Sequence, residues 1–377
     1  MTDLRAQSHF AHLASGAVGI TAAAFGRVNL IGEHTDYHQG FVLPMPVPRR
    51  TVVTVRRHPG YAVRARSANV VPAVAEYELG EESRVGSWID YVQGVTYIVA
   101  KSGRGLAGFD VSIDSNLPPG GGVSSSAALT VALLRALRAM YRFELGDIEI
   151  AHLAQKVETE FIGAPIGIMD QMACSVGRPD EALFLDTRSL HFERIPWPSH
   201  IGIVVINSGL AHAHAGGQYA TRRRESFAAA ALLNVRWLRD AKAASLDRAN
   251  LPELLRRRAR HVVTENQRVL DAVEALRACD PDRLGELFNA SHESMKSDYE
   301  VSTPAIDTLV GIGQADDDIY GARLTGGGFG GSVLMLAHAG RARCAAERIV
   351  EEYRKKTGLP GSVMVPEMSG ASAFRRL

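Results

Sequence analysis

Cysteine is scarce in this chain: three occur among 377 residues, at positions 174, 279 and 344. They lie far apart, and no Cys-x-x-Cys pair or cysteine–histidine spacing accompanies them. A disulfide framework needs paired cysteines and a structural zinc site needs closely spaced ligands, so the sequence indicates neither. We therefore expect free thiols in a reducing compartment, and a cytoplasmic protein.

A long apolar run and an excess of charge of one sign are lacking as well. Without a run of roughly 18 apolar residues, no transmembrane helix is expected. The small-residue stretch from Ala14 to Phe25 has no strongly basic lead and contains polar residues, so we do not expect a signal peptide. The chain carries 42 basic and 41 acidic residues, for a net charge of +1. This balance indicates no nucleic-acid or membrane partner.

The chain is long enough for two domains, each with its own core. Segments of period 2, typical of strands, mix with segments of period 3.6, typical of helices, without strict βαβ alternation, so we predict the α+β class. The clearest strand is Phe109 to Ser115, and the clearest buried helix is Ser126 to Tyr141. Prolines and polar residues from Pro196 to His200 interrupt the pattern. They predict a first domain over residues 1–196 and a second over residues 197–377.

A glycine- and serine-rich segment, Leu117 to Ala128, joins that strand to that helix. Its glycines let backbone N–H groups approach a ligand closely, and its serines stand where the helix begins. A helix N-terminus carries unpaired N–H groups and partial positive charge, so it attracts phosphate. A flexible loop with serine N-caps is the alternative. No Gly-Lys-Ser/Thr follows, which excludes a Walker A loop.

A second glycine cluster, Leu324 to Gly331, formally fits the dinucleotide-binding pattern G-x-G-x-x-G. A strand-like segment follows it, whereas that pattern requires a helix, so we discard a Rossmann fold. Five glycines in six positions are more than a tight turn needs. We expect a loop that packs closely against another backbone or a ligand.

Polar side chains crowd the segment Gly26 to Tyr37, where Glu33, His34 and Asp36 follow a strand-like stretch. Two carboxylates and an imidazole at one turn can bind several hydroxyls, which is what a sugar presents. A metal site and a solvated turn are the alternatives. Arg27 stands in an otherwise core-like part of this segment, which favours a functional interpretation.

Asp170 is a lone acid in the apolar, glycine-containing segment Gly163 to Met172. A carboxylate in such a setting must be paired, or its pKa must shift. Arg27 is a candidate partner. A catalytic carboxylate, a helix N-cap and a structural ion pair all stay open from these residues alone.

Taken together and in this order, the segments resemble the galactokinases, a family of the GHMP kinase superfamily. The stretch Gly26 to Pro44 is similar to the galactokinase signature, and Gly163 to Gln171 to the segment that carries the family's catalytic aspartate. The two glycine-rich segments resemble motifs that all GHMP kinases share. Further similar segments are Asn207-Ser208, Tyr219 to Arg224 and Asp298 to Pro304.

The resemblance implies an enzyme that phosphorylates the 1-hydroxyl of galactose with ATP. It implies a two-domain GHMP kinase fold, with a ribosomal-protein-S5-like N-terminal domain and a ferredoxin-like α+β C-terminal domain. By matching position, Asp170 and Arg27 would be the catalytic pair. Galactose would be held by Glu33, His34, Asp36, Gly167 and Tyr219, ATP by Gly120, Gly121, Gly122, Ser124, Ser125 and Ser126, and Mg²⁺ by Ser125 and Glu158. We expect galactose and ATP as substrates, and a monomer or weak homo-oligomer.

Three other functions compete with this interpretation. The nearest is a GHMP sugar-1-kinase for N-acetylgalactosamine, arabinose or a uronic acid. A mevalonate- or homoserine-type kinase would share the glycine motifs, but would have no reason to carry the run from Glu33 to Asp36. A sensor that binds galactose and ATP without turnover ranks well below the enzyme, since the matched catalytic residues are present.

Overall fold

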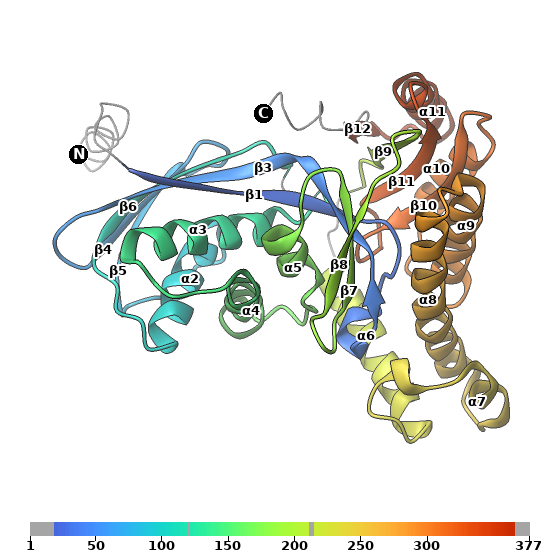
Figure 1. Ribbon diagram of the computed structural model, residues 1–377, viewed down its shortest axis with the longest axis horizontal. Coiled ribbons are helices and arrows are strands. Elements are labelled where there is room, and N and C mark those ends of the chain that lie inside the picture. The colour runs from blue at the N-terminus through green and yellow to red at the C-terminus, as the bar shows by residue number, and fades with distance from the viewer. Residues whose placement is uncertain (1–18, 119–120, 211–214, 366–377) are drawn as a thin grey trace. The chain divides into compact units, whose positions relative to one another are not determined.

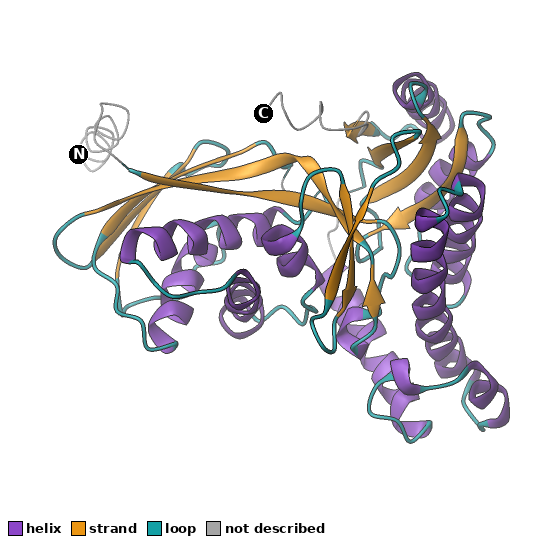
Figure 2. Cartoon of the chain, viewed as in Figure 1, coloured by secondary structure: helices purple, strands orange, loops and turns teal. Residues whose placement is uncertain are grey.

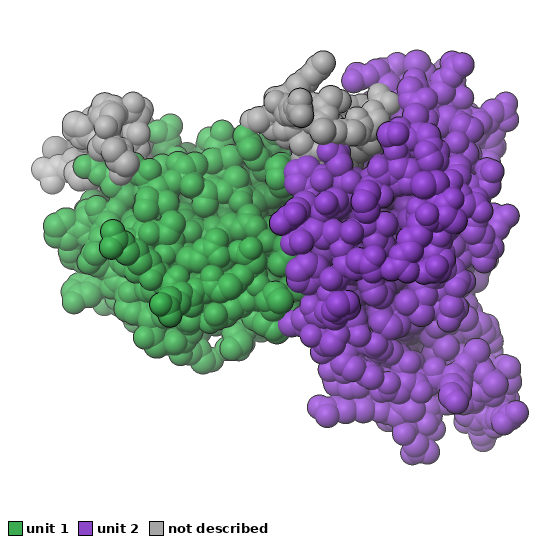
Figure 3. Space-filling model, in the orientation of Figure 1, with its two compact units in different colours: residues 1–26, 49–119, 124–176 green, residues 27–48, 120–123, 177–377 purple. Residues whose placement is uncertain are grey.

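The computed structural model of the protein describes residues 19–118, 121–210 and 215–365 (Figure 1). These residues form two compact units (Figure 3). Within the described residues, the first unit comprises 19–26, 49–118 and 124–176, and the second comprises 27–48, 121–123, 177–210 and 215–365. Each unit thus draws on separate stretches of the chain. The domain boundary at residue 196 that the sequence suggests stays a prediction.

The first unit is built on a five-stranded sheet with strand order β1-β3-β6-β4-β5. Strand β6 pairs antiparallel with β3 and parallel with β4, and β4 pairs antiparallel with β5. The strands are β1 (Ile20–Asn29), β3 (Pro44–Arg57), β4 (Ala62–Ser67), β5 (Val74–Glu78) and β6 (Phe109–Ser115). Both β1 and β3 contribute residues to the two units.

Helices gather on one face of this sheet (Figure 2). They are α2 (Ile89–Lys101), α3 (Ser125–Tyr141), α4 (Asp147–Lys156), the π-helical turn η2 (Val157–Ile162) and α5 (Met169–Val176). Helix α3 is rich in alanine and leucine, and nine of its residues are buried. Such an apolar helix is stable only when it is covered, so it forms the centre of this layer. The predicted strand at Phe109 and the predicted buried helix at Ser126 are both confirmed, the latter within one residue.

The second unit contains a four-stranded antiparallel sheet with strand order β10-β11-β9-β12. Its strands are β9 (Ile201–Asn207), β10 (Ile319–Thr325), β11 (Ser332–His338) and β12 (Ser362–Val365). A three-stranded antiparallel sheet has the order β2-β7-β8, from β2 (Phe41–Val42), β7 (Glu181–Asp186) and β8 (Phe192–Pro196). The first six residues of β9 are all buried, as its continuous apolar sequence predicts.

Helices supply the rest of the second unit. They are α6 (Ala215–Leu232), α7 (Ala243–Arg248), α8 (Glu253–Arg277), α9 (Pro281–Ser297), α10 (Pro304–Gln314), α11 (Ala342–Thr357) and the short turns η1 (Asp36–His38) and η3 (Leu238–Asp240). The sequence pattern predicts one helix from Tyr219 to Ala241, and that prediction is wrong at its end. The helix stops at Leu232, because Asn234 takes a left-handed conformation (φ 54°) that ends an α-helix.

The strands and helices together confirm the predicted α+β class. Among the described residues, no helix is long and apolar enough to cross a membrane.

Candidate functional site

Asp170 lies in the first turn of α5, where a serine from the start of α3 contacts it. The Ser124 hydroxyl donates a hydrogen bond to Asp170 Oδ2 at 2.7 Å. Ser124 is 8% exposed, and Asp170 is half-buried. Gly167 lies three residues earlier, in the loop that leads into α5. The structure therefore brings Ser124 and Asp170 together, and Gly167 lies in the loop just before Asp170.

A second contact lies directly beside this one. Gln171 Nε2 donates to Glu158 Oε1 at 2.9 Å, and the Ser126 hydroxyl donates to the same oxygen at 3.3 Å. Glu158 is 8% exposed and Gln171 is fully buried. The starts of α3 and α5 are thus tied at two neighbouring points, one through Asp170 and one through Glu158.

The donor set around Glu158 fits a magnesium ion only in part. Carboxylate and hydroxyl oxygens are the hard ligands that Mg²⁺ takes, usually together with waters and substrate phosphates. Glu158 and the hydroxyls of Ser125 and Ser126 are of this kind, and Ser125 is half-buried at the first position of α3. Among the described residues, no group of three or more His, Cys, Asp and Glu side chains could hold a metal. The residues therefore supply only part of a magnesium coordination sphere, and waters or phosphate oxygens would have to complete it.

Arg27 and the described glycines of the phosphate-loop candidate lie together in the second unit. The Arg27 guanidinium donates to the carbonyl oxygen of Gly122 at 2.9 Å, and its backbone N–H donates to Val123 O at 3.1 Å. The Ser332 hydroxyl donates to Gly121 O at 3.0 Å. These bonds fix the loop backbone from β1 and from β11. Gly120 lies outside the described residues, and the pairing of Arg27 with Asp170 stays a prediction.

Glu33 is buried in an internal network. It forms an ion pair with Arg323, and its Oε1 accepts from the Gly326 N–H at 3.0 Å and from the Thr325 hydroxyl at 3.3 Å. Arg323 is fully buried and Glu33 is 2% exposed. Burial raises the pKa of Glu33, and the neighbouring Arg323 opposes that rise. Glu33 therefore connects the turn after β1 to the start of the second glycine cluster.

A second buried carboxylate, Glu265 on α8, completes the surroundings of Arg323. Its Oε1 accepts from the Ser291 hydroxyl at 2.7 Å and from the Gly32 N–H at 3.0 Å. Burial alone would raise the pKa of Glu265, but Arg268, His261 and Arg323 lower it to about 2. Sequence reasoning missed Arg323 and Glu265. The available signal was a lone arginine inside the apolar strand β10, which demands a buried carboxylate partner.

His34 lies in an aromatic cluster of the second unit. Its Nδ1 and the Tyr37 hydroxyl are 2.9 Å apart, and that hydroxyl is 2.7 Å from the hydroxyl of Tyr299. The rings of His34 and Tyr219 have centroids 5.2 Å apart. His34 has a left-handed backbone (φ 62°), a conformation that non-glycine residues adopt mostly where the surrounding structure imposes it. The structure thus brings His34 and Tyr219 together.

Asp36 begins the short turn η1, two residues after His34. Its Oδ1 accepts from the Tyr37 N–H at 2.9 Å, and its carbonyl oxygen accepts from the Thr187 hydroxyl at 3.2 Å. The side chain is half-buried. Of the predicted sugar-binding residues, Glu33, His34, Asp36 and Tyr219 belong to the second unit and Gly167 to the first.

The second glycine cluster packs against backbone and side chain, as the sequence predicts. A Cβ atom on Gly328 would lie 2.5 Å from the carbonyl oxygen of Val301, and Gly328 has φ +84°. A Cβ atom on Gly327 would lie 3.3 Å from the Tyr219 ring. Larger residues at Gly328 would therefore clash with backbone and strain the turn.

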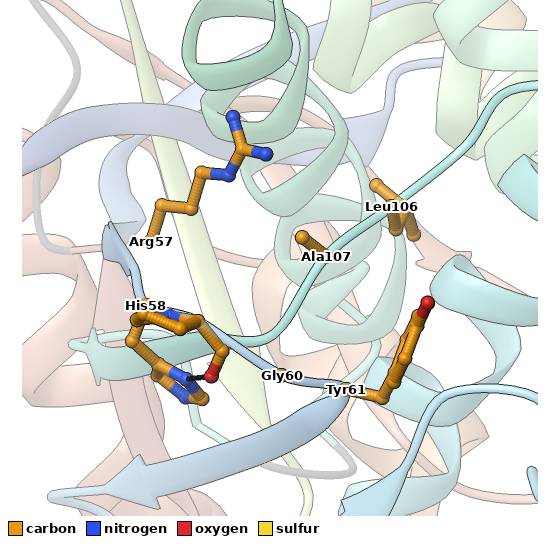
Figure 4. Close-up of a pocket in the computed structure, with 7 residues that line it drawn as sticks. Arg57, His58, Gly60, Tyr61, Leu106 and Ala107 are labelled. Carbon is orange, nitrogen blue, oxygen red and sulfur yellow. Dashed lines mark hydrogen bonds between the residues drawn. The ribbon is translucent and has the colours of Figure 1, made fainter.

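A surface hollow of about 650 Å³ lies at the turn between β3 and β4 (Figure 4). Its lining includes the exposed residues Arg57 and Tyr61. None of the lining residues belongs to the predicted site, so the hollow has no part in the chemistry proposed below.

Three buried histidines of the second unit predict a loss of stability in mild acid. Burial lowers the pKa of His34 and His38 to about 3 and that of His261 to about 4. Between about pH 4 and 6.5 the unfolded chain therefore binds more protons than the folded protein, and stability falls as the pH drops. Each histidine contributes at most about 1.4 kcal/mol per pH unit.

The free energy of unfolding in urea, measured at pH 7.5 and pH 5.5, should fall by a few kcal/mol. His38→Gln should flatten this dependence, because it removes one buried imidazole. The exposed His191 offers a matched control, and His191→Gln should leave the slope unchanged. Equal stability of the unaltered protein at both pH values would contradict the prediction.

Comparison with known proteins places these features in a family. Three family models match: the galactokinase galactose-binding signature over residues 8–57, the GHMP kinases N terminal domain over 90–178 and the GHMP kinases C terminal over 272–355. The fold is similar to that of Methanococcus jannaschii mevalonate kinase, with a TM-score of 0.67 and 18% identity over 92% of this chain and 98% of that chain. At this identity the likeness shows the fold alone, which is that of the GHMP kinases.

Two further proteins are more similar. The crystal structure of Lactococcus lactis galactokinase complexed with galactose superimposes with a TM-score of 0.90 and 31% identity, covering 97% of this chain and 98% of that one. A galactokinase from Roseiflexus sp. (strain RS-1) is 38% identical over 357 residues, which is 92% of this chain and 90% of the relative. The chain belongs to the galactokinase family.

Proposed function

We propose that the protein transfers the γ-phosphoryl group of ATP to the 1-hydroxyl of galactose, giving galactose 1-phosphate and ADP. The observation that carries this proposal is the match of residues 8–57 to the galactose-binding signature, within a chain 38% identical to a galactokinase over 92% of its length. That matched segment contains Arg27, Glu33, His34 and Asp36.

In the proposed step, Asp170 accepts the proton of the 1-hydroxyl. The sugar oxygen forms a bond to the γ-phosphorus, the bond from that phosphorus to its bridging oxygen breaks, and ADP leaves with the electron pair. A positioned base typically contributes ~10²- to 10⁴-fold to the rate. Its hydrogen bond from Ser124 supports this role for Asp170, because it keeps the carboxylate in one orientation.

Arg27 is proposed to stabilise the negative charge on the transferring group. An arginine in this role contributes ~10³- to 10⁵-fold in other phosphoryl-transfer enzymes. Its guanidinium already contacts the glycine-rich loop through Gly122 and is 5% exposed. A positive charge held against a candidate phosphate loop suits this task.

The sugar hydroxyls are proposed to bind His34, Asp36, Glu33, Gly167 and Tyr219. His34 is neutral at physiological pH, since burial lowers its pKa to about 3, so it offers one donor and one acceptor nitrogen. Glu33 is already bonded to Arg323 and to the Gly326 N–H, so it also orders the turn that carries His34 and Asp36.

The ATP phosphates are proposed to bind Gly120, Gly121, Gly122, Ser125 and Ser126. The start of α3 supports this assignment, because a helix N-terminus attracts anions. Ser125 and Glu158 would hold Mg²⁺. When bound, the ion neutralises charge on the phosphate oxygens. Three free cysteines fit a reducing compartment, and we place the reaction in the cytoplasm, in a monomer or weak homo-oligomer.

The test is ADP release by the purified protein with ATP and Mg²⁺, compared across galactose, N-acetylgalactosamine, arabinose, glucose and no sugar. We expect galactose to have the highest kcat/KM, at least ~10-fold above glucose, because glucose leaves a polar group of the pocket unpaired at about 1–3 kcal/mol. Preference for another sugar would support the kinase activity but change the substrate that we assign. Binding of galactose without turnover on any sugar would overturn the proposed activity.

A further inference from the structure

The residue before α3, Ser124, does not behave as a serine at a helix start ordinarily does. Serine at the N-cap usually accepts a hydrogen bond from a backbone N–H of the first turn. Ser124 makes no such side-chain bond, and its backbone is left-handed, with φ 57° and ψ 46°. Its carbonyl oxygen accepts from the Ala128 N–H at 3.0 Å, so it does begin the helix.

The Ser124 hydroxyl is turned to Asp170 instead. The two residues are 46 positions apart in the sequence, and the bond is short, at 2.7 Å. A left-handed backbone costs a non-glycine residue of the order of 1 kcal/mol. A charge-assisted hydrogen bond is about twice as strong as a neutral one, so it can offset this cost.

The neighbouring residues keep this geometry rigid. Gln171 follows Asp170 on α5 and is fully buried, and its amide donates to Glu158. Ser126 donates to that same carboxylate from the first turn of α3. The starts of the two helices are therefore also connected through Glu158, beside the bond from Ser124 to Asp170.

We propose that Ser124 is a positioning residue for Asp170, and that its hydroxyl serves the carboxylate and not the nucleotide. The Ser124 hydroxyl donates a hydrogen bond to one carboxylate oxygen and so fixes the plane of the carboxylate group. This inference rests on the proposed function, in which Asp170 receives the proton of the sugar hydroxyl. It replaces the ATP-binding role of Ser124 that family position implies.

The test uses Ser124→Ala and Ser124→Gly in the full chain, with steady-state kinetics for galactose and ATP. Loss of a hydrogen bond to a charged group predicts a fall in kcat of roughly 10- to 100-fold. Both KM values should stay within about twofold, because neither substrate loses a contact. Ser124→Gly also relieves the left-handed backbone, so it should be at least as stable as Ser124→Ala and still lose kcat.

A matched control comes from the same helix as Asp170. Ser175 is 2% exposed, and its hydroxyl donates to the carbonyl oxygen of Asp147, also at 2.7 Å. Ser175→Ala therefore removes a buried serine hydrogen bond of the same length, away from Asp170. It should lower stability and leave kcat unchanged.

A double-mutant cycle distinguishes this positioning role from direct binding of ATP by Ser124. If Ser124 acts through Asp170, adding Ser124→Ala to Asp170→Asn should change the residual kcat by less than about twofold. Where that residual rate is too low to measure, the affinity of each single variant for a fluorescent ATP analogue, measured by titration, distinguishes the two roles. Unchanged nucleotide affinity in Ser124→Ala supports the proposal.

Two results would overturn it: a normal kcat with a raised KM for ATP, or a kcat loss in the Asp170→Asn background as large as in the unaltered protein. Failure of the proposed function itself is distinguishable. It would appear first in the unaltered protein, as absence of galactose phosphorylation, or in Asp170→Asn alone, as near-normal turnover.

Discussion

Asp170→Asn should turn over galactose at least ~10²-fold more slowly than the unaltered protein. The amide has nearly the same size as the carboxylate, but it does not accept the proton of the sugar hydroxyl. The bond from Ser124 stays possible, because the amide oxygen can accept it in place of Oδ2. Substrate binding should therefore persist while the chemical step is lost.

The measurement is kcat from ADP release, together with galactose and ATP affinities and the midpoint of urea unfolding. The unfolding curve shows whether a slower variant is also a less stable one. Asp147→Asn is a suitable control. Asp147 lies at the start of α4, is half exposed and forms an ion pair with Arg138. It makes the same chemical change away from Asp170 and should keep full activity. Near-normal turnover in Asp170→Asn would remove Asp170 from the catalytic role.

Arg323→Met should lower the free energy of unfolding by about 3–5 kcal/mol. Arg323 is fully buried between two carboxylates, Glu33 and Glu265, that are themselves buried. Methionine keeps an unbranched apolar stem but removes the charge, so both carboxylates lose their shared partner. The hydrogen bonds that the Arg323 guanidinium donates to the carbonyl oxygens of Asn29 and Leu30 are lost as well.

Denaturant unfolding of Arg323→Met beside Arg348→Met measures this effect. Arg348 lies in the same unit and pairs with Asp316 and Asp318, but its side chain is 52% exposed. Exposed pairs contribute about 0–1 kcal/mol, so Arg348→Met should change little. Adding Glu33→Gln to Arg323→Met should recover part of the loss, since it removes one unpaired charge. Similar stability changes in the two arginine variants would contradict the buried network.

The segments that sequence patterns located best are those whose structure depends on near neighbours. The alternation from Phe109 to Ser115 gave β6, and the apolar run after the serines gave α3. The close packing of the second glycine cluster also followed from its composition, as Gly328 against Val301 illustrates. Family resemblance, carried by the run from Gly26 to Tyr37, then indicated the chemistry.

The end of α6 marks where local patterns stopped being sufficient. Its apolar residues continue in a helical rhythm beyond Leu232, but Asn234 turns the chain and only the short η3 follows. Asparagine tolerates the left-handed conformation without requiring it. Whether it ends a helix depends on what the following residues pack against, and Leu238, which follows the break, is fully buried.

The sequence by itself determined the α+β class, the phosphate-loop candidate, the candidate sugar-binding turn and the family. Tertiary structure alone decided which partners the polar groups take. Arg323 meets Glu33 across 290 positions of chain, and Ser124 meets Asp170 across 46. A buried charge must be paired with an opposite charge that the fold brings close to it. Hydrophobic patterns in the sequence do not indicate which charges become neighbours in this way. For the same reason, a serine that the sequence assigns to a phosphate loop lies in the structure against a carboxylate.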